Sequence, residues 1–345
     1  MVAKRNSAPL VISMGDPAGI GAEVILKAAA RLLARGEAIP LAVIGDLEIM
    51  RATARRLGNV PLPTAWTPED SLVPIRRGLG VFSPSDTLAG AIRPGHPTLD
   101  GAKAAFRYIV EGARMALEGR ACALVTGPIN KQMFNRAGHR IPGHSELLAR
   151  MSHTRLWRMM FAGGDLRLAL VTVHVGLAQV ARALTRGRVF KTIALLAAHL
   201  KSEMGIAKPR IAVLGFNPHA GEGGLFGDEE IRVISPAIKR AVKCGIDAYG
   251  PLAPDTAFIR PRGRFDFDAA VAMYHDQGLI ALKTLEFDRA VNITIGLPFV
   301  RTSPDHGTAY DIAGRGVANP TSMLAAIDYA WGAAMRRGSR LRKAA

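Results

Sequence analysis

The chain has 345 residues and a mass of 36.8 kDa, a length that fits one large domain or two linked domains. Hydrophobic residues make up 49% and charged residues 21%, a balance typical of globular proteins rather than of disordered or fibrous ones. The 45 Lys and Arg exceed the 28 Asp and Glu by 17, so nucleic acid and anionic small molecules are both candidate partners.

Apolar segments of strand length alternate with longer helix-like segments. The predicted strands are Leu10 to Met14, Leu41 to Ile44, Ala121 to Val125, Leu166 to Val173, Arg210 to Leu214 and Ala269 to Tyr274. The predicted helices include Ile20 to Arg35, Gly101 to Leu117 and Val189 to Glu203, and the proline-rich segment Pro61 to Pro84 is expected to be a loop. This alternation indicates an α/β fold. Strands that are apolar at successive positions favour mainly parallel pairing, with helices on both faces.

Glycine and polar residues follow five of these strands directly. The segments are Gly15 to Gly21, Thr126 to Lys131, His174, Gly215 to Gly224 and Tyr274 to Gly278. Because ligands bind at the carboxyl ends of the strands in open α/β sheets, these segments predict one shared crevice. The first segment lacks the G-x-G-x-x-G spacing and the Walker lysine, which disfavours a Rossmann or P-loop site. It is either an anion-binding helix start or a tight turn.

Three widely separated histidines, His174, His219 and His275, each stand just past a hydrophobic strand. Imidazoles that converge from three strand ends would hold a divalent metal and leave a position open for a substrate oxygen. The alternative for each histidine alone is an ordinary hydrogen-bonding residue. The glycines from Gly221 to Gly227 are interpreted either as a flexible lid or as a loop whose glycines take positive φ.

Cationic and hydroxyl side chains downstream suit an anionic substrate. Arg301 offers a bidentate fork and Lys283 a point charge, although Lys283 alone is equally explained as a solvated surface cation. At the start of a helix-like segment, Ser145 either caps the helix or binds ligand oxygens, and His144 could accept a proton.

Other features limit location and partners. No apolar run is long enough for a membrane span, and Met1 to Gly15 lacks the hydrophobic region of a signal peptide. The two cysteines, Cys122 and Cys244, favour a reducing, cytoplasmic setting. The arginines are scattered except in Arg336 to Lys343, and no nucleic-acid-binding motif accompanies them, so no nucleic-acid partner is expected. A basic nucleic-acid-binding protein is the non-enzyme alternative.

Six ordered motifs span nearly the whole chain. They are GDPAGIG at Gly15 to Gly21, TGPINK at Thr126 to Lys131, PGHSE at Pro142 to Glu146, NPHAGEGG at Asn217 to Gly224, MYHDQG at Met273 to Gly278 and GLPFVRTSPDHGTAYDIAGRG at Gly296 to Gly316. Together they resemble the 4-hydroxythreonine-4-phosphate dehydrogenase family, NAD-dependent enzymes of pyridoxal 5'-phosphate biosynthesis. The last motif also resembles the cofactor loop of isocitrate and isopropylmalate dehydrogenases, which explains a nicotinamide enzyme without a Rossmann fingerprint.

The resemblance implies a set of site residues. The metal ligands would be His174, His219 and His275, contributed across the interface of a homodimer. The substrate contacts would be His144, Ser145, Lys283, Asn292 and Arg301. The cofactor contacts would be His306, Gly307, Thr308, Ala309 and Asp311. The candidate catalytic residues are Lys283, His144 and Asp255, and a relayed water is the alternative for removal of the hydroxyl proton.

The resemblance also implies an architecture. The expected fold class is a two-domain α/β architecture like that of isocitrate and isopropylmalate dehydrogenases, with mainly parallel sheets and the active site in the interdomain cleft. Residues 1–136 with 296–345 would form the cofactor-side domain, and residues 137–295 the metal, substrate and dimerisation domain. The expected cofactors are NAD, or NADP, and a divalent metal, with zinc preferred and magnesium or cobalt as alternatives.

The expected reaction is oxidation of 4-phosphohydroxy-L-threonine at C3, followed by decarboxylation to 3-amino-2-oxopropyl phosphate. Two departures from the family pattern, Ser145 for threonine and Asp16 for glutamate, preserve the hydroxyl and the carboxylate but leave the substrate open. The alternative is a D-threonate or D-erythronate 4-phosphate dehydrogenase of sugar-acid catabolism. A more distant relative oxidises an aromatic cis-diol carboxylate, but the Lys and Arg residues favour a phosphorylated hydroxy acid.

Overall fold

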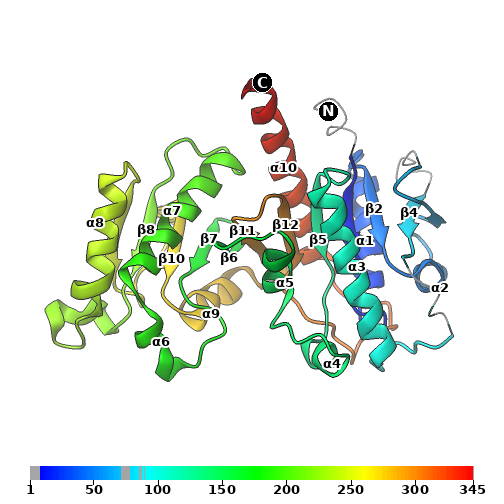
Figure 1. The fold of residues 1–345 in the computed structure, drawn as a ribbon, viewed down its shortest axis with the longest axis horizontal. Coiled ribbons are helices and arrows are strands. Elements are labelled where there is room, and N and C mark those ends of the chain that lie inside the picture. The colour runs from blue at the N-terminus through cyan, green and yellow to red at the C-terminus, as the bar shows by residue number, and fades with distance from the viewer. Residues whose placement is uncertain (1–7, 71–77, 85–87, 89, 345) are drawn as a thin grey trace. The chain divides into compact units, whose positions relative to one another are not determined.

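The computed structural model describes residues 8–344 except 71–77, 85–87 and 89 (Figure 1). Residues 1–7 of the N-terminal segment Met1 to Gly15 lie outside the described residues. The chain divides into two compact units, unit 1 with Met1–Arg155 and Leu297–Ala345, and unit 2 with Leu156–Gly296. Unit 1 therefore extends beyond the expected boundary at residue 136 and includes α5 (His144–Met151).

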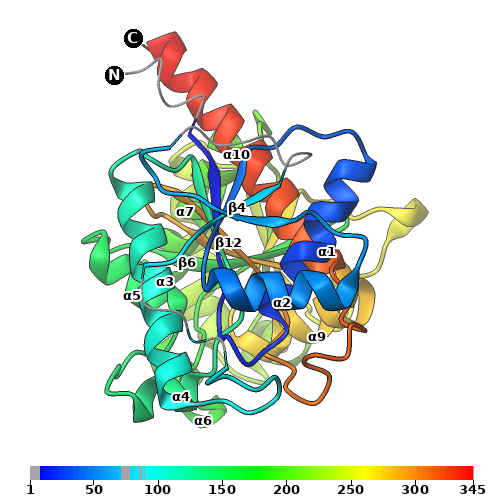
Figure 2. The ribbon, with the colours of Figure 1, turned by 90° about the vertical axis from the view of Figure 1, so that its right-hand side faces the viewer.

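Unit 1 contains a parallel sheet with the strand order β3-β4-β2-β1-β5-β12. Its strands are β1 (Leu10–Ser13), β2 (Leu41–Ile44), β3 (Pro63–Ala65), β4 (Leu79–Phe82), β5 (Ala123–Thr126) and β12 (Val300–Pro304). Its other helices are α1 (Gly21–Ala34), α2 (Leu47–Leu57), α3 (Leu99–Leu117), α4 (Lys131–Arg136) and α10 (Thr321–Ala344). Figure 2 shows α3 on one side of the strands and α1 with α10 on the other. Because both faces are covered, β1, β2 and β5 are buried at every position.

Unit 2 contains a mixed sheet with the strand order β11-β6-β7-β10-β8-β9. Its strands are β6 (Arg158–Gly163), β7 (Leu166–Leu170), β8 (Ile211–Leu214), β9 (Ala248–Leu252), β10 (Ala269–Ala272) and β11 (Val291–Ile295). Strand β6 runs antiparallel to both β11 and β7, whereas β7, β10, β8 and β9 are parallel. Its helices are α6 (Leu177–Ala183), α7 (Arg186–Ser202), α8 (Ser235–Lys243) and α9 (His275–Glu286). The predicted α/β fold with mainly parallel strands is confirmed.

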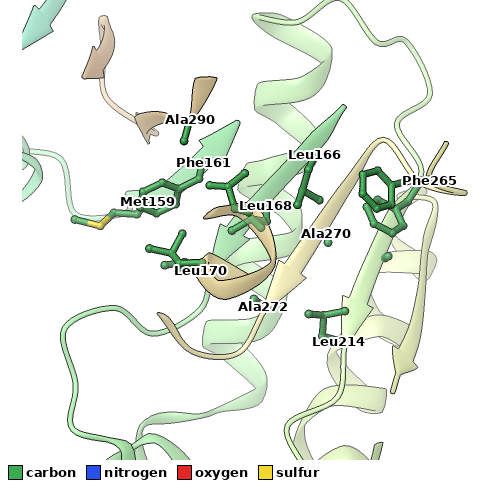
Figure 3. Close-up of a cluster of buried hydrophobic side chains, with 14 residues drawn as sticks. Met159, Phe161, Leu166, Leu168, Leu170, Leu214, Phe265, Ala270, Ala272 and Ala290 are labelled. Atoms are coloured by element: carbon green, nitrogen blue, oxygen red, sulfur yellow. The ribbon is translucent and has the colours of Figure 1, made fainter. Parts of the chain in front are cut away.

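A cluster of buried apolar side chains forms the core of unit 2 (Figure 3). Phe161 and Leu168 project from adjacent strands, and Leu279 and Leu282 of α9 belong to the same cluster. Burying a side chain of this size stabilises the folded state by about 1.5 to 3 kcal/mol. The core therefore fixes α9, which begins at His275, against β7 and β10.

The expectation of a loop over Pro61 to Pro84 is wrong in part, because β3 and β4 lie within it. Both strands pair in parallel with a neighbour, and β4 joins the edge of a buried sheet through β2. Residues 71–77 of that segment lie outside the described residues. Within the described part of the chain, no helix is both long and apolar enough to cross a membrane.

Candidate active site

The three histidine-bearing segments of unit 2 leave the same edge of its sheet. His174 follows β7, His275 follows β10, and His219 follows β8. These strands are neighbours in the order β7-β10-β8 and run parallel, so their carboxyl ends coincide. The three segments of unit 2 therefore lie at one edge of its sheet, and the single crevice shared by all five segments stays a prediction.

Two buried polar side chains tie these segments together. The Thr172 hydroxyl donates to the Met273 carbonyl oxygen at 2.7 Å, which joins the ends of β7 and β10. The Gln277 side chain accepts from the Met273 amide at 2.7 Å and donates to the Gly215 carbonyl oxygen at 2.7 Å. These bonds link the end of β10 to the start of the segment that carries His219. The three segments are thus held in a fixed register.

The structure brings two of the three imidazoles side by side. The ring centroids of His174 and His275 are 6.1 Å apart, with the ring planes tilted by 40°. Nδ1 of His275 lies 2.6 Å from an Asp276 carboxylate oxygen, a partner that orients the ring and leaves Nε2 as the ligating nitrogen. His219 is exposed, with Nδ1 3.8 Å from the carboxylate of Asp255.

Among the residues that the structure describes, no three His, Cys, Asp or Glu side chains form a metal-holding group within one chain. The assignment of His219 with His174 and His275 to one cation stays a prediction, since the resemblance implies that ligands come from two subunits. Nitrogen donors from neutral imidazoles, with a carboxylate behind one ring, nevertheless suit a divalent transition metal.

Lys283 and Asn292 occupy different elements of unit 2. Lys283 lies on α9, seven residues after Asp276 and therefore on the same face of the helix. Asp276 and Lys283 line a shallow hollow along this helix. Asn292 lies on β11, opposite Phe161 of β6. Their proposed contacts with substrate stay predictions.

A buried cation lies on the sheet of unit 1, beside the end of β5. Arg301, on β12, is only 2% exposed and donates from Nη2 to the Thr126 hydroxyl on β5 at 2.6 Å. Burial lowers the pKa of Arg301 to about 9, while the Glu146 carboxylate acts in the opposite direction. The guanidinium stays charged at neutral pH and carries a desolvated positive charge that attracts anions.

His144 is a neutral hydrogen-bonding group close to this cation. It is the first residue of α5, and its buried Nε2 has no hydrogen-bond partner among the described residues. Burial holds the pKa of His144 well below its usual value of 6.5, and the positive charges of Arg301 and Lys131 lower it further. At neutral pH this imidazole is therefore uncharged and can accept a proton. The adjacent Ser145 is buried.

The candidate cofactor loop packs against the first glycine segment. The Tyr310 hydroxyl donates to the buried Asp16 carboxylate at 2.7 Å, and the Ile20 amide donates to the Thr308 carbonyl oxygen at 3.0 Å. A Cβ at Gly19 would lie 3.0 Å from that same carbonyl oxygen, so the two segments are in close contact. Burial is the largest cause of the raised pKa of both Asp16 and Tyr310.

The glycines in this first segment are required for packing. A Cβ at Gly21 would overlap the carbonyl oxygen of Met14, and Gly15 has a φ of +81° beside the carbonyl oxygen of Pro128. A tight turn therefore accounts for these glycines. Of the alternatives for this segment, the structure supports the turn.

Within the candidate cofactor loop, His306 has a defined ring orientation. Its Nδ1 lies 3.0 Å from the Gly307 carbonyl oxygen, which assigns the proton to Nδ1. The Nε2 atom is buried, without a hydrogen-bond partner in the described part of the chain. Burial lowers the pKa of His306. The imidazole thus offers an acceptor nitrogen to a ligand that carries an N–H or O–H donor.

Sequence reasoning missed the residues that hold these loops. They are Thr172, Gln277, Tyr310, Glu23 and Glu230. Gln277 lies inside a motif that was identified, but its role depends on contacts between strands that are far apart in the sequence. The sequence signal that could have pointed to one of them is the polar residue Thr172 just after the apolar strand β7.

The chain is similar along nearly its whole length to known proteins. A family model described as pyridoxal phosphate biosynthetic protein PdxA matches residues 37–330. A 4-hydroxythreonine-4-phosphate dehydrogenase from Maricaulis maris is 46% identical, with 93% of this chain and 96% of the relative covered. A Bradyrhizobium diazoefficiens protein, provisionally named a D-threonate 4-phosphate dehydrogenase, is 43% identical, with 94% and 96% covered. A crystal structure of 4-hydroxythreonine-4-phosphate dehydrogenase from Klebsiella pneumoniae has a TM-score of 0.82 at 38% identity, with 95% and 98% covered.

Proposed function

Because the chain belongs to the PdxA family of pyridoxal phosphate biosynthetic proteins, we propose that it oxidises 4-phosphohydroxy-L-threonine at C3 with NAD. Decarboxylation of the resulting β-keto acid then gives 3-amino-2-oxopropyl phosphate. The names of the Maricaulis and Klebsiella relatives support this substrate. The observation that carries the proposal is the pair of imidazoles, His174 and His275, side by side beyond the carboxyl ends of the parallel strands β7 and β10.

We propose that His174, His219 and His275 hold the divalent cation, with zinc preferred and magnesium or cobalt as alternatives, because nitrogen donors favour a transition metal over magnesium. When bound, the cation supplies Lewis acidity and the nicotinamide supplies the hydride acceptor. Asp276 keeps the His275 ring oriented through its bond to Nδ1. Thr172 and Gln277 keep the three histidine segments in register.

The chain's own residues bind the substrate and manage its protons. Arg301 supplies a desolvated charge for an anionic group of the substrate, and we propose that Lys283 and Asn292 contribute further contacts. His144 can take the hydroxyl proton at Nε2 because its low pKa leaves it neutral at pH 7. Lys283, Asp255 and a relayed water remain the alternative bases.

The cofactor contacts are proposed at His306, Gly307, Thr308, Ala309 and Asp311. Two hydrogen bonds hold this loop against the segment that follows β1, from the Tyr310 hydroxyl to Asp16 and from the Ile20 amide to the Thr308 carbonyl oxygen. The loop backbone therefore stays close to the end of β1. The acceptor nitrogen of His306 suits an exocyclic amine or hydroxyl of a dinucleotide. NAD is preferred and NADP is the alternative.

We further propose that the protein acts as a homodimer with the active site shared across the interface, in the cytoplasm. Support comes from large apolar side chains that unit 2 exposes, including Leu177, Leu225, Ile280 and Phe287. A contiguous patch of exposed apolar side chains is typical of a surface that contacts another chain. Light scattering of the purified protein measures the mass directly, and a monomer at micromolar concentration would contradict the dimer.

The second candidate function is the oxidation of D-threonate or D-erythronate 4-phosphate, favoured by the name of the Bradyrhizobium relative. The test measures NAD reduction with 4-phosphohydroxy-L-threonine and with D-threonate 4-phosphate, each before and after chelation and after zinc is restored. We expect faster, metal-dependent turnover of the first substrate. Comparable or faster turnover of the second would reverse the substrate assignment. Full activity after complete metal removal would refute the proposed metal role.

A further inference from the structure

His219 lies in a backbone segment of unusual handedness. Six consecutive residues of the turn Pro218–Gly224 have positive φ, namely His219 (+50°), Ala220 (+53°), Gly221 (+81°), Glu222 (+41°), Gly223 (+66°) and Gly224 (+107°). Three of them are not glycine, and each such residue costs about 1 to 2 kcal/mol in the left-handed region. Such a turn persists only where surrounding contacts hold it. The glycines of this loop do take positive φ, as one of the two sequence interpretations expected.

The carboxylate of Glu230 supplies the contacts that hold this turn. Glu230 is 3% exposed, and its Oε1 accepts from the amides of Phe216 and Asn217 at 2.6 and 2.7 Å. Its Oε2 accepts from the Asn217 side-chain amide at 2.9 Å. All three donors belong to the two residues that lead from β8 into the turn. One buried carboxylate therefore fixes the direction in which the chain enters it.

The same carboxylate lies against the turn itself. A Cβ at Gly221 would be 2.7 Å from Oε2 of Glu230, and one at Gly215 would be 3.2 Å from Oε1. The backbone approaches the carboxylate this closely only because both positions are glycine. Glu230 in turn begins the π-helical segment Glu230–Ile234, a kind of helix distortion that is often found at functional sites.

We propose that Glu230 is a positioning residue for His219, because it selects the left-handed turn that presents the imidazole beyond the end of β8. Glu230 acts through the backbone of Phe216 and Asn217 and through Gly221. The inference rests on the proposed function, in which His219 is a ligand of the divalent cation. In the absence of the carboxylate, the strained turn relaxes and His219 samples other positions. Metal affinity falls because the ligand must then be reordered on binding.

The test compares zinc affinity in Glu230→Gln and Glu230→Ala with that of the unchanged protein, by competition with a chromophoric chelator. Groups that orient the ligands of a metal ion are worth about 10- to 100-fold in metal affinity, so we expect a loss of that size in Glu230→Ala. Glu230→Gln keeps the size and one acceptor oxygen and should recover part of the affinity. Asp228→Asn is the matched control. Asp228 is an exposed acid two residues before Glu230 whose carboxylate pairs with Arg232, so we expect affinity within about twofold of the unchanged protein.

Thermal unfolding of the metal-free variants separates positioning from general stability. Glu230→Gln is expected to remain folded at the temperature of the zinc titration and still bind zinc more weakly. A folded Glu230→Gln and Glu230→Ala pair with unchanged zinc affinity would overturn the positioning role. Should Glu230→Ala not fold, Glu230→Gln decides alone, and unchanged affinity in it overturns the inference. If the unchanged protein itself binds no zinc, it is the proposed metal function that fails.

Discussion

Glu23 in the first turn of α1 anchors the segment that follows the candidate cofactor loop. Its carboxylate accepts from the amides of Ala318 at 2.7 Å and Gly316 at 3.2 Å, and from Nζ of Lys27 at 2.8 Å. Lys27 donates in addition to the carbonyl oxygens of Gly316 and Ala318. Replacement Glu23→Ala removes the acceptor from two backbone amides and the counter-charge from Lys27.

The expected cost follows from the number of donors left without an acceptor. A buried donor that loses its partner costs about 1 to 3 kcal/mol, so two amides imply a loss of about 2 to 6 kcal/mol in unfolding free energy. Glu48→Ala is the matched control, because Glu48 also lies in the first turn of a helix and pairs with Arg51 at 2.7 Å. Its side chain is 41% exposed, against 3% for Glu23, so we expect less than about 1 kcal/mol.

Urea denaturation followed by circular dichroism measures both variants, and the KM for NAD reports on the loop. We expect Glu23→Ala to lower the denaturation midpoint and to raise the KM for NAD more than it lowers kcat, since the loop that is proposed to bind the cofactor loses its anchor. A stability loss no larger than that of Glu48→Ala would refute the reasoning about buried donors. An unchanged KM in a destabilised protein would refute the link between the anchor and the cofactor.

Three further predictions concern a glycine, a proton and a charge. Gly21→Ala forces a Cβ into the Met14 carbonyl oxygen and should cost about 3 kcal/mol or more by urea denaturation, whereas Gly187→Ala, in the first turn of α7 with open space around it, should cost nothing. In the unfolded chain His144 takes up a proton as the pH falls through about 6.5, whereas burial lowers its pKa in the folded protein. The contribution of His144 to the free energy of unfolding should therefore be fully present above about pH 6.5 and fall as the pH drops below it. Urea titrations at pH 7.5 and 5.5 should show a smaller fall in His144→Gln, and an equal fall would contradict the burial argument. Arg301→Gln should lower kcat/KM by about 100-fold or more through the loss of a desolvated anion contact, and an unchanged KM for the phosphorylated substrate would exclude it from binding.

The central strands could be predicted from the sequence because burial on both faces leaves uninterrupted apolar runs. Strand β2 has the predicted bounds, and β1, β8 and β10 each lie within the predicted range. The edge strands escaped because their signal is weaker. The short strand β3 contains a proline, and β9 contains Gly250 and Pro251, residues typical of turns. The stretch from Ile293 to Val300 lies outside the predicted strands and holds the end of β11 and the start of β12.

The candidate site was only partly accessible to sequence reasoning. The position of His174, His219 and His275 at one edge follows from parallel strands and could be predicted. The pairing of His174 with His275 requires the strand order, which local patterns do not encode. The role of Glu230 was hidden further, because it depends on a helix distortion and on a left-handed turn eleven residues earlier.

The side chain of Gln277 restricts what can replace it. Its side-chain oxygen accepts a hydrogen bond from the Met273 amide, and its side-chain nitrogen donates one to the Gly215 carbonyl oxygen. The position therefore requires one acceptor and one donor on the same side chain. A glutamate of the same shape would set a carboxylate against a carbonyl oxygen, and a lysine would set an ammonium against a backbone amide. Substitution by either an acid or a base would break the link between the ends of β10 and β8. Few substitutions at this position can therefore preserve the arrangement of the two strand ends.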